Sequence, residues 1–198
     1  MAVTREQYEA GTSYEEWKAA MTRNQEQLAT QEKAIEIKPE EVAAIKNLAK
    51  PVKVLAIGED WCGDVIANLP ILAKVAEVTG KLDVKVILRD TEPGKTVMQD
   101  YLNKGEFLSI PVFVFLDDDF NEIGNFKERP DSVTDMRAKQ REDIGKAHPE
   151  WGDLSRPMPE LPEDVRTGFQ AELARLRAET LPFANSEVVR EIREIVAK

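Results

Sequence analysis

The sequence predicts an α/β fold in which a central mixed sheet is flanked by helices. Strand-like and helix-like segments alternate over residues 52–103, as they do in a β-α-β-α unit with parallel strands. Two more strand-like segments follow at residues 112–126, separated only by a short acidic turn, which is the pattern of an antiparallel hairpin. A parallel pair joined to a hairpin gives a sheet of mixed direction.

The predicted strands are short apolar or alternating runs bounded by turn-forming residues. They comprise residues 52–57, 83–90, 112–116 and 122–126. The first is almost uninterruptedly apolar between Pro51 and Gly58, which is typical of a strand covered on both faces.

The predicted helices repeat apolar side chains every three to four positions. They comprise residues 12–36, 39–50, 62–79, 96–103, 163–179 and 186–197. Ser13 and Glu16 form a capping box at the start of the first, and Pro39 opens the second. After Pro130 the chain turns helical and polar to about residue 150, and a proline-rich connector then leads to the last two helices.

The length of the chain suits one domain with extensions. A chain of 198 residues with 42% hydrophobic content can bury the core of a domain of roughly 100–150 residues. We expect an N-terminal helical extension over residues 1–34, the α/β domain over residues 35–140, and a C-terminal helical extension over residues 141–198 that packs on the same domain.

The charge of the chain limits its partners. With 27 basic and 37 acidic residues, the formal charge of -10 would repel nucleic-acid phosphates and anionic lipids, so we expect no nucleic acid and no membrane partner. The first residues lack the apolar core of a signal peptide, which favours a cytoplasmic location. One cysteine and one histidine are too few for an internal disulfide or a Cys/His zinc site, and we expect no metal.

Two motifs resemble those of thioredoxins. Residues 59–63, Glu-Asp-Trp-Cys-Gly, follow a buried strand and open a helix, and Pro70 lies eight residues beyond the cysteine. Residues 109–113, Ser-Ile-Pro-Val-Phe, resemble the cis-proline loop that leads into the hairpin of that family. The order of elements is similar as well, so residues 35–140 resemble the thioredoxin-like superfamily, and one group of bacterial members has similar extensions.

The candidate catalytic residue is Cys62. At a helix N-terminus, unpaired backbone N–H groups and the macrodipole favour the thiolate, which is the form that attacks disulfides. Gly63 would leave access to the sulfur, and Trp61 would present a flat apolar surface to an extended partner segment. Asp64 would stabilise the helix start, although its charge, like that of the two acidic residues before Trp61, disfavours a neighbouring thiolate.

Ile110 and Pro111 complete the candidate substrate-binding set with Trp61, Gly63 and Asp64. If it is cis, Pro111 removes a backbone N–H near the thiol and exposes the Ile110 carbonyl and N–H for strand-like pairing with a bound peptide.

The motif departs from thioredoxins at two positions. Val65 stands where the second cysteine would be, and Ala56 stands where thioredoxins carry a buried acid that assists proton transfer to that cysteine. A mixed disulfide on Cys62 therefore needs an external thiol to release it, either glutathione, another low-molecular-weight thiol or a second protein.

Two functions fit these residues. One is a monothiol oxidoreductase that exchanges protein or small-molecule disulfides through Cys62 without a bound cofactor. The other is a non-catalytic module that uses the same scaffold to hold a partner protein. A peroxidase is disfavoured, because the threonine and arginine of a peroxide site are missing around Cys62. We interpret Asp117 to Asp119 as a solvated turn rather than a cation site, and His148 as a surface residue rather than a base for Cys62.

Overall fold

The computed structural model describes residues 3–197 and divides into two compact units. One unit holds the described residues up to Pro130 together with those from Asn185 onward, and the other holds Asp131–Ala184. This division separates the parts of the chain that make most of their contacts within themselves. The extensions predicted over residues 1–34 and 141–198 divide the chain differently and remain predictions.

The first unit is built on a four-stranded sheet in the order β2-β1-β3-β4. Its strands are β1 (Val52–Ile57), β2 (Leu82–Ile87), β3 (Val112–Leu116) and β4 (Glu122–Lys127). β1 pairs in parallel with β2 and antiparallel with β3, and β4 completes an antiparallel hairpin with β3. The mixed sheet predicted from the sequence is confirmed, and every side chain of its central strand β3 is buried.

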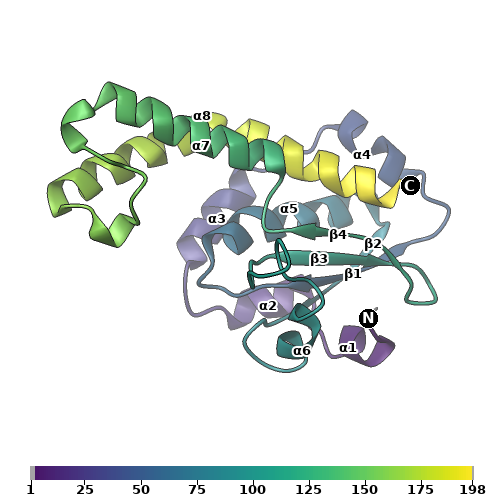
Figure 1. Ribbon diagram of the computed structural model, residues 1–198. Helices are drawn as coiled ribbons and strands as arrows, with labels where there is room; N and C mark the ends of the chain where they lie inside the picture. Colours follow the sequence, from purple (N-terminus) through teal and green to yellow (C-terminus); the bar gives the residue numbers. More distant parts are fainter. Residues whose placement is uncertain (1–2, 198) are drawn as a thin grey trace. The chain divides into compact units, whose positions relative to one another are not determined.

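Helices cover both faces of this sheet (Figure 1). Figure 1 shows α5 (Gly63–Thr79) and the last part of α8 (Glu163–Val196) on one side, with α6 (Gly94–Met98) and the short α1 (Arg5–Glu9) on the other. α3 (Gln25–Ala34) and α4 (Pro39–Lys46) pack against α5. α5 contains Pro70 and buries one face made largely of aliphatic side chains.

The helix predicted over residues 12–36 is wrong as a single element. The chain forms α2 (Tyr14–Ala20) and α3 (Gln25–Ala34), separated by a turn in which Asn24 has a positive φ of 55°. The backbone N–H groups of Thr22 and Arg23 donate to the carboxylate of Asp60, 2.7 and 3.0 Å away, instead of continuing the helix. Tertiary hydrogen bonds to the carboxylate of a distant residue therefore override the local helical pattern.

The second unit contains α7 (Asp131–Ala147), two short 3-10 turns (Pro149–Trp151 and Met158–Glu160) and the first part of α8. Its buried apolar cluster comprises Ile144, Leu154, Leu161, Val165 and Phe169. His148 stacks on Trp151 with ring centroids 3.8 Å apart and lies 3.0 Å from a Glu150 carboxylate oxygen.

The two helices predicted over residues 163–179 and 186–197 are one. α8 runs from Glu163 to Val196 with Pro182 inside it. A proline removes one main-chain donor and crowds the carbonyl four residues earlier, but it ends a helix only where packing does not compensate. Here buried aliphatic side chains follow at helical spacing, as Val188, Val189 and Ile192.

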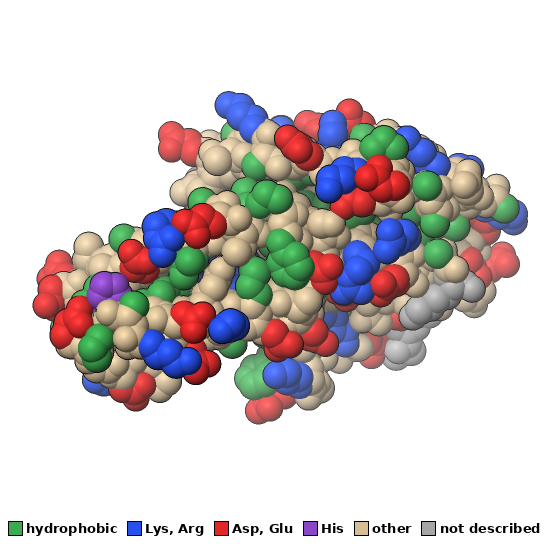
Figure 2. Space-filling model, turned by 90° about the horizontal axis from the view of Figure 1, so that it is seen from above, with side chains coloured by type: hydrophobic (Ala, Val, Ile, Leu, Met, Phe, Trp, Pro, Cys, Tyr) green, Lys and Arg blue, Asp and Glu red, His purple; other side chains and the backbone are tan. Residues whose placement is uncertain are grey.

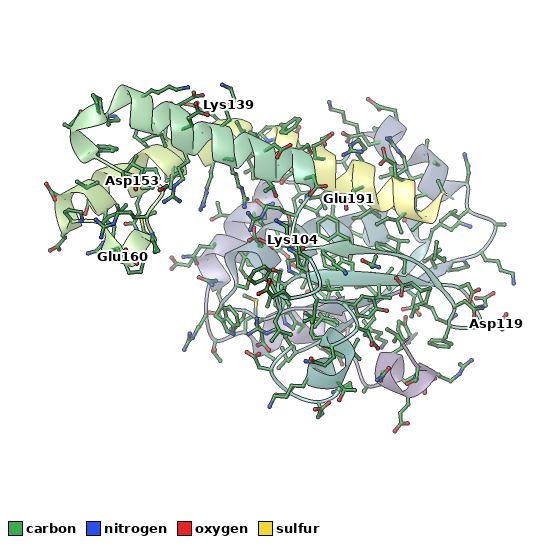
Figure 3. The ribbon with its side chains drawn as sticks, in the orientation of Figure 1. Lys104, Asp119, Lys139, Asp153, Glu160 and Glu191 are labelled. Atoms are coloured by element: carbon green, nitrogen blue, oxygen red, sulfur yellow. The ribbon has the colours of Figure 1, made fainter. Side chains whose placement is uncertain are left out.

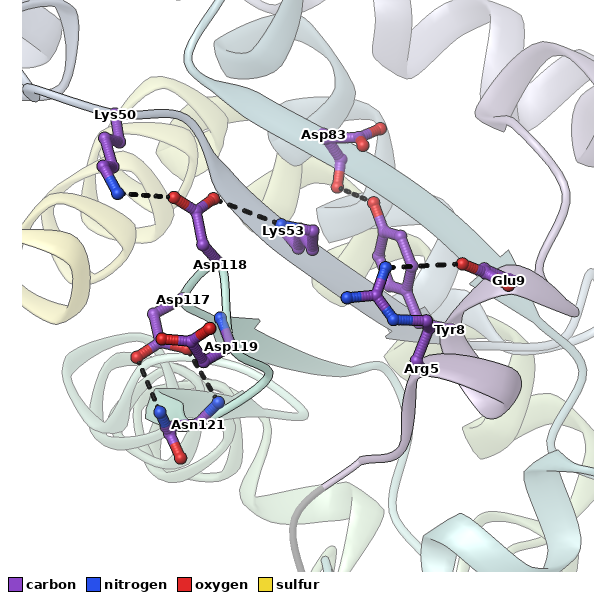
Figure 4. A network of polar contacts seen from close by, with 10 residues as sticks. All are labelled: Arg5, Tyr8, Glu9, Lys50, Lys53, Asp83, Asp117, Asp118, Asp119 and Asn121. Carbon is purple, nitrogen blue, oxygen red and sulfur yellow. Dashed lines mark hydrogen bonds and ion pairs between the residues drawn. The ribbon is translucent and has the colours of Figure 1, made fainter.

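The acidic turn between β3 and β4 is occupied by internal partners (Figure 4). Asp118 binds Lys50 and Lys53 at 2.8 and 3.3 Å, while Asp117 accepts backbone hydrogen bonds from Asp119 and Asn121. Figure 3 shows Asp119 at the tip of this hairpin, away from Lys104 near the other end of the strands.

Within residues 3–197, no three histidine, cysteine or acidic side chains are grouped to hold a metal ion.

Acidic and basic side chains alternate on the face shown in Figure 2, and neither sign gathers there into one large patch. No helix in the described part of the chain combines the length and apolar character needed to cross a membrane.

Gly94 supplies a stability test of the fold. It is buried at the start of α6, and a Cβ atom there would lie 1.9 Å from the carbonyl oxygen of Leu88. Gly94→Ala should therefore lower the free energy of unfolding by about 2–3 kcal/mol, as overpacking against backbone does. Urea denaturation measures the change.

Gly63→Ala is the matched control, since a Cβ atom at this helical position would meet nothing within 4 Å. It should leave stability unchanged or raise it by up to about 1 kcal/mol. Equal effects of the two substitutions would contradict the close approach of α6 to the end of β2.

Candidate functional site

Cys62 lies at the junction between the sheet and α5. It is the N-cap residue of α5, and its own backbone N–H donates to the Glu59 carbonyl at 3.2 Å. Its side chain is partly exposed, and Sγ lies 3.5 Å from the carbonyl oxygen of Ile110, a residue 48 positions away in sequence. The thiol thus donates to the backbone of the loop that enters β3.

The Ile110–Pro111 segment is held from two sides. The peptide bond between the two residues is cis, and both side chains are buried. Pro111 O accepts a 2.7 Å hydrogen bond from the backbone N–H of Glu128, which follows β4 directly. The Ile110 side chain is only 4% exposed, and the Ile110 atom that accepts from the Cys62 sulfur is the carbonyl oxygen.

Trp61 is an exposed ring beside the thiol. It is 41% exposed, and the Arg89 guanidinium lies 4.8 Å from its ring centroid. The same guanidinium donates to the Leu108 carbonyl at 3.1 Å and to the Asp90 carboxylate at 2.8 Å. The exposed ring therefore forms one side of a cation–π contact.

Leu88 and Leu108 are also exposed, at 41% and 45%. Arg89 joins the Leu108 backbone carbonyl to the Trp61 ring, so the residue before Cys62 presents an apolar ring with a guanidinium packed on it. Arg89 follows β2 and belongs to no sequence motif, so only the folded sheet reveals its contact with Trp61.

The charge of Asp64 is paired with Arg129, a residue that no sequence motif indicates. Asp64 Oδ2 lies 2.6 Å from an Arg129 nitrogen, and the same nitrogen also contacts the Glu128 carboxylate. Both Asp64 and Arg129 have side chains that are only 20% exposed, so solvent screens this pair less than it screens a surface pair. The repulsion that Asp64 would exert on a Cys62 thiolate is thereby reduced.

The hairpin register could have revealed this pairing. Val112 is opposite Lys127, so the residues just after β4 return to the loop that carries Pro111. Glu128 then bonds Asn103 as well, at 2.9 Å, which links the loop before β3 to the end of the hairpin.

The two acidic residues before Trp61 have structural partners. Glu59 is 8% exposed and accepts a 2.8 Å hydrogen bond from the backbone N–H of Asp90. Burial acts to raise the pKa of Asp60, but hydrogen bonds from Thr22 and Arg23 outweigh it and hold that pKa below its ordinary value. Asp60 therefore stays charged while it anchors the turn between α2 and α3.

The two positions that distinguish this site from a dithiol site are packed with apolar side chains. Val65 is fully buried in the first turn of α5, and its methyl groups contact the backbone at Gly58 so closely that a Cβ there would lie 2.9 Å from one of them. Ala56 is buried within β1. Gly63, by contrast, is exposed and open.

The fold agrees with the comparisons to known proteins. The sequence profile of the thioredoxin family matches residues 11–142. A crystal structure of a protein of unknown function from Pseudomonas aeruginosa is similar, with 18% identity, a TM-score of 0.66, and coverage of 99% of this chain and 98% of that one.

An HIV epitope scaffold is similar to the same degree, with 16% identity, a TM-score of 0.65 and coverage of 98% of both chains. A comparison with curated proteins gave no match. At these identities, the two structures support the fold alone. Because the family profile spans well over half of the sequence, the chain belongs to the thioredoxin family.

Proposed function

We propose that this protein is a monothiol disulfide oxidoreductase that acts through Cys62. The observation that carries the proposal is the position of the sulfur. It lies at the N-terminus of a 17-residue helix, partly exposed, and 3.5 Å from the Ile110 carbonyl. The helix end favours a thiolate, and the adjacent backbone offers a place for an extended disulfide-bearing segment.

The proposed reaction needs two exchanges. The Cys62 thiolate attacks one sulfur of a substrate disulfide, a new S–S bond forms to Cys62, and the other substrate sulfur leaves as a thiolate. An external thiolate then attacks the substrate sulfur of the mixed disulfide and forms a new disulfide with it, so that Cys62 leaves as a thiolate. Val65 cannot resolve the intermediate, so the second thiol comes from glutathione or a similar low-molecular-weight thiol, or from a protein.

The substrate would be a protein or small-molecule disulfide, with Trp61, Gly63, Asp64, Ile110 and Pro111 forming the surface that receives it. A reducing bacterial cytoplasm supplies the low-molecular-weight thiol that this scheme requires, so the proposal includes a cytoplasmic location.

A non-catalytic binding module is the second candidate. It is favoured by the apolar packing at Val65 and Ala56, which leaves no internal route for a dithiol cycle. The exposed Trp61 surface would then hold a partner segment without covalent chemistry.

Cys62→Ser separates the two candidates. The hydroxyl keeps the size and the hydrogen bond to Ile110 O but cannot form a disulfide. For an oxidoreductase, the variant should lose all glutathione-dependent reduction of a peptide disulfide and form no mixed disulfide by intact mass. If the wild-type protein shows neither activity while wild type and variant bind a partner equally, the oxidoreductase proposal fails and the module remains.

Arg129→Gln tests the electrostatic part of the proposal. Without the guanidinium, the negative charges of Asp64 and Glu128 near the start of α5 are no longer offset by Arg129, and they disfavour the thiolate. The rate of Cys62 with a neutral disulfide, 2,2′-dithiodipyridine, should fall about 2–5-fold, as expected for one charge near a helix end.

Arg129→Gln combined with Asp64→Asn should restore part of that rate, because only the Glu128 charge then remains without the guanidinium. The difference in rate between the single and double variants should narrow in 1 M salt, where the Debye length is about 3 Å. If the double variant is as slow as the single one, Arg129 acts through the loop structure rather than through charge.

A further inference from the structure

Arg89 lies where three segments of the first unit meet. It follows the end of β2, and its guanidinium lies 4.8 Å from the centroid of the Trp61 ring and donates to the Leu108 carbonyl at 3.1 Å. Trp61 directly precedes Cys62, and Leu108 lies two residues before Ile110. One side chain therefore joins the segment that carries the thiol to the loop that provides its carbonyl partner.

The Arg89 guanidinium is held in place by a carboxylate. Its Nε donates to the Asp90 carboxylate at 2.8 Å, and the backbone N–H of Asp90 donates to Oε1 of Glu59, also at 2.8 Å. Glu59 is only 8% exposed, and its carbonyl accepts the backbone N–H of Cys62 at 3.2 Å. The segment before α5 is therefore tied to the end of β2 at two points, once through Glu59 and once through Trp61.

This set of contacts requires an arginine. A guanidinium is planar, so it can lie over a ring while its N–H groups donate to a carboxylate and a carbonyl at the same time. A lysine ammonium is a compact point charge and lacks this fork of donors. The Arg89 side chain is only 20% exposed, so solvent weakens its contacts less than it weakens those of a surface arginine.

We propose that Arg89 is a positioning residue for the disulfide exchange, because it fixes the Trp61 ring next to Cys62 as a preformed surface for a protein or peptide disulfide. The inference rests on the proposed function. Trp61 is 41% exposed, and an exposed ring without such a partner exchanges between rotamers. Each substrate would then have to order the ring as it binds, which lowers affinity. Arg89 acts through Trp61 and leaves the reactivity of the sulfur itself unchanged.

Steady-state reduction of oxytocin, a peptide with one disulfide, tests this role in the full-length protein at saturating glutathione. Arg89→Gln should raise KM about 5–10-fold, as expected for the loss of a partly buried cation–π contact, and should leave kcat within about twofold. The rate of Cys62 with 2,2′-dithiodipyridine should also stay within about twofold, because this small reagent does not need the Trp61 surface. A general disturbance of the fold would lower both rates.

A double-mutant cycle shows whether Arg89 acts through the ring. In a Trp61→Ala background, Arg89→Gln should change KM by less than about twofold, because its contact partner is already absent. Arg89→Lys keeps the charge but lacks the planar fork, so its KM should rise nearly as far as that of Arg89→Gln.

Arg5→Gln is the matched control. The Arg5 guanidinium lies 4.6 Å from the centroid of the Phe120 ring in the same unit, and Arg5 forms an ion pair with Glu9. This substitution removes the arginine of a different cation–π contact and should leave the KM for oxytocin unchanged.

Four results would overturn the role of Arg89. They are a wild-type KM in Arg89→Gln, a wild-type KM in Arg89→Lys, an equally large effect of Arg89→Gln without Trp61, and a loss of rate with 2,2′-dithiodipyridine as large as the loss of kcat/KM. If the wild-type protein does not reduce oxytocin, the proposed function fails together with this role. If the wild-type protein does reduce it and Arg89→Gln is indistinguishable, this role alone fails.

Discussion

The pairing of β1 with β3 is the constraint on which the site depends. Ile57 is opposite Val112 in this antiparallel pair, so the residues after β1 and the residues before β3 emerge at the same edge of the sheet. Cys62 follows β1 and Ile110 precedes β3, and the 3.5 Å contact between sulfur and carbonyl oxygen results from that register. Both strands are buried, so shifting the register would move apolar side chains out of the core.

A second set of contacts fixes the same edge from the hairpin side. Glu128 donates its backbone N–H to Pro111 O and bonds Asn103 through its carboxylate, while Arg129 pairs with Asp64 in the first turn of α5. The end of β4 therefore holds both the proline loop and the helix start. The position of the thiol and the charge around it are set by one group of residues.

The elements that the sequence predicts well are those whose secondary structure depends on their own residues. β1 and β3 are nearly continuous apolar runs, and their predicted ends agree with the structure. α5 follows from the spacing of its apolar residues and from the Trp-Cys-Gly segment at its start. The sequence could place Cys62 near Ile110 because the family that it resembles has a topology in which these two positions are close. The register between β1 and β3 then determines their contact.

The failures arise where a distant residue decides the local structure. The Asp60 carboxylate accepts hydrogen bonds from the backbone N–H groups of Thr22 and Arg23, and a segment with a continuous helical pattern therefore forms two helices. Pro182 suggests a helix end in the sequence but lies inside α8. Arg89 and Arg129 belong to no motif, so their contacts with Trp61 and Asp64 required the folded sheet.

If Cys62 is a catalytic thiol, the fold should make its sulfur more reactive toward disulfides than the sulfur of an unstructured cysteine. The most direct measurement compares the second-order rate of Cys62 with 2,2′-dithiodipyridine at pH 7 in the native protein and in the same chain unfolded in urea, corrected with a model thiol in both solvents. If the fold activates Cys62, the native protein should react faster than the unfolded chain. A native rate equal to or below that of the unfolded chain would contradict it.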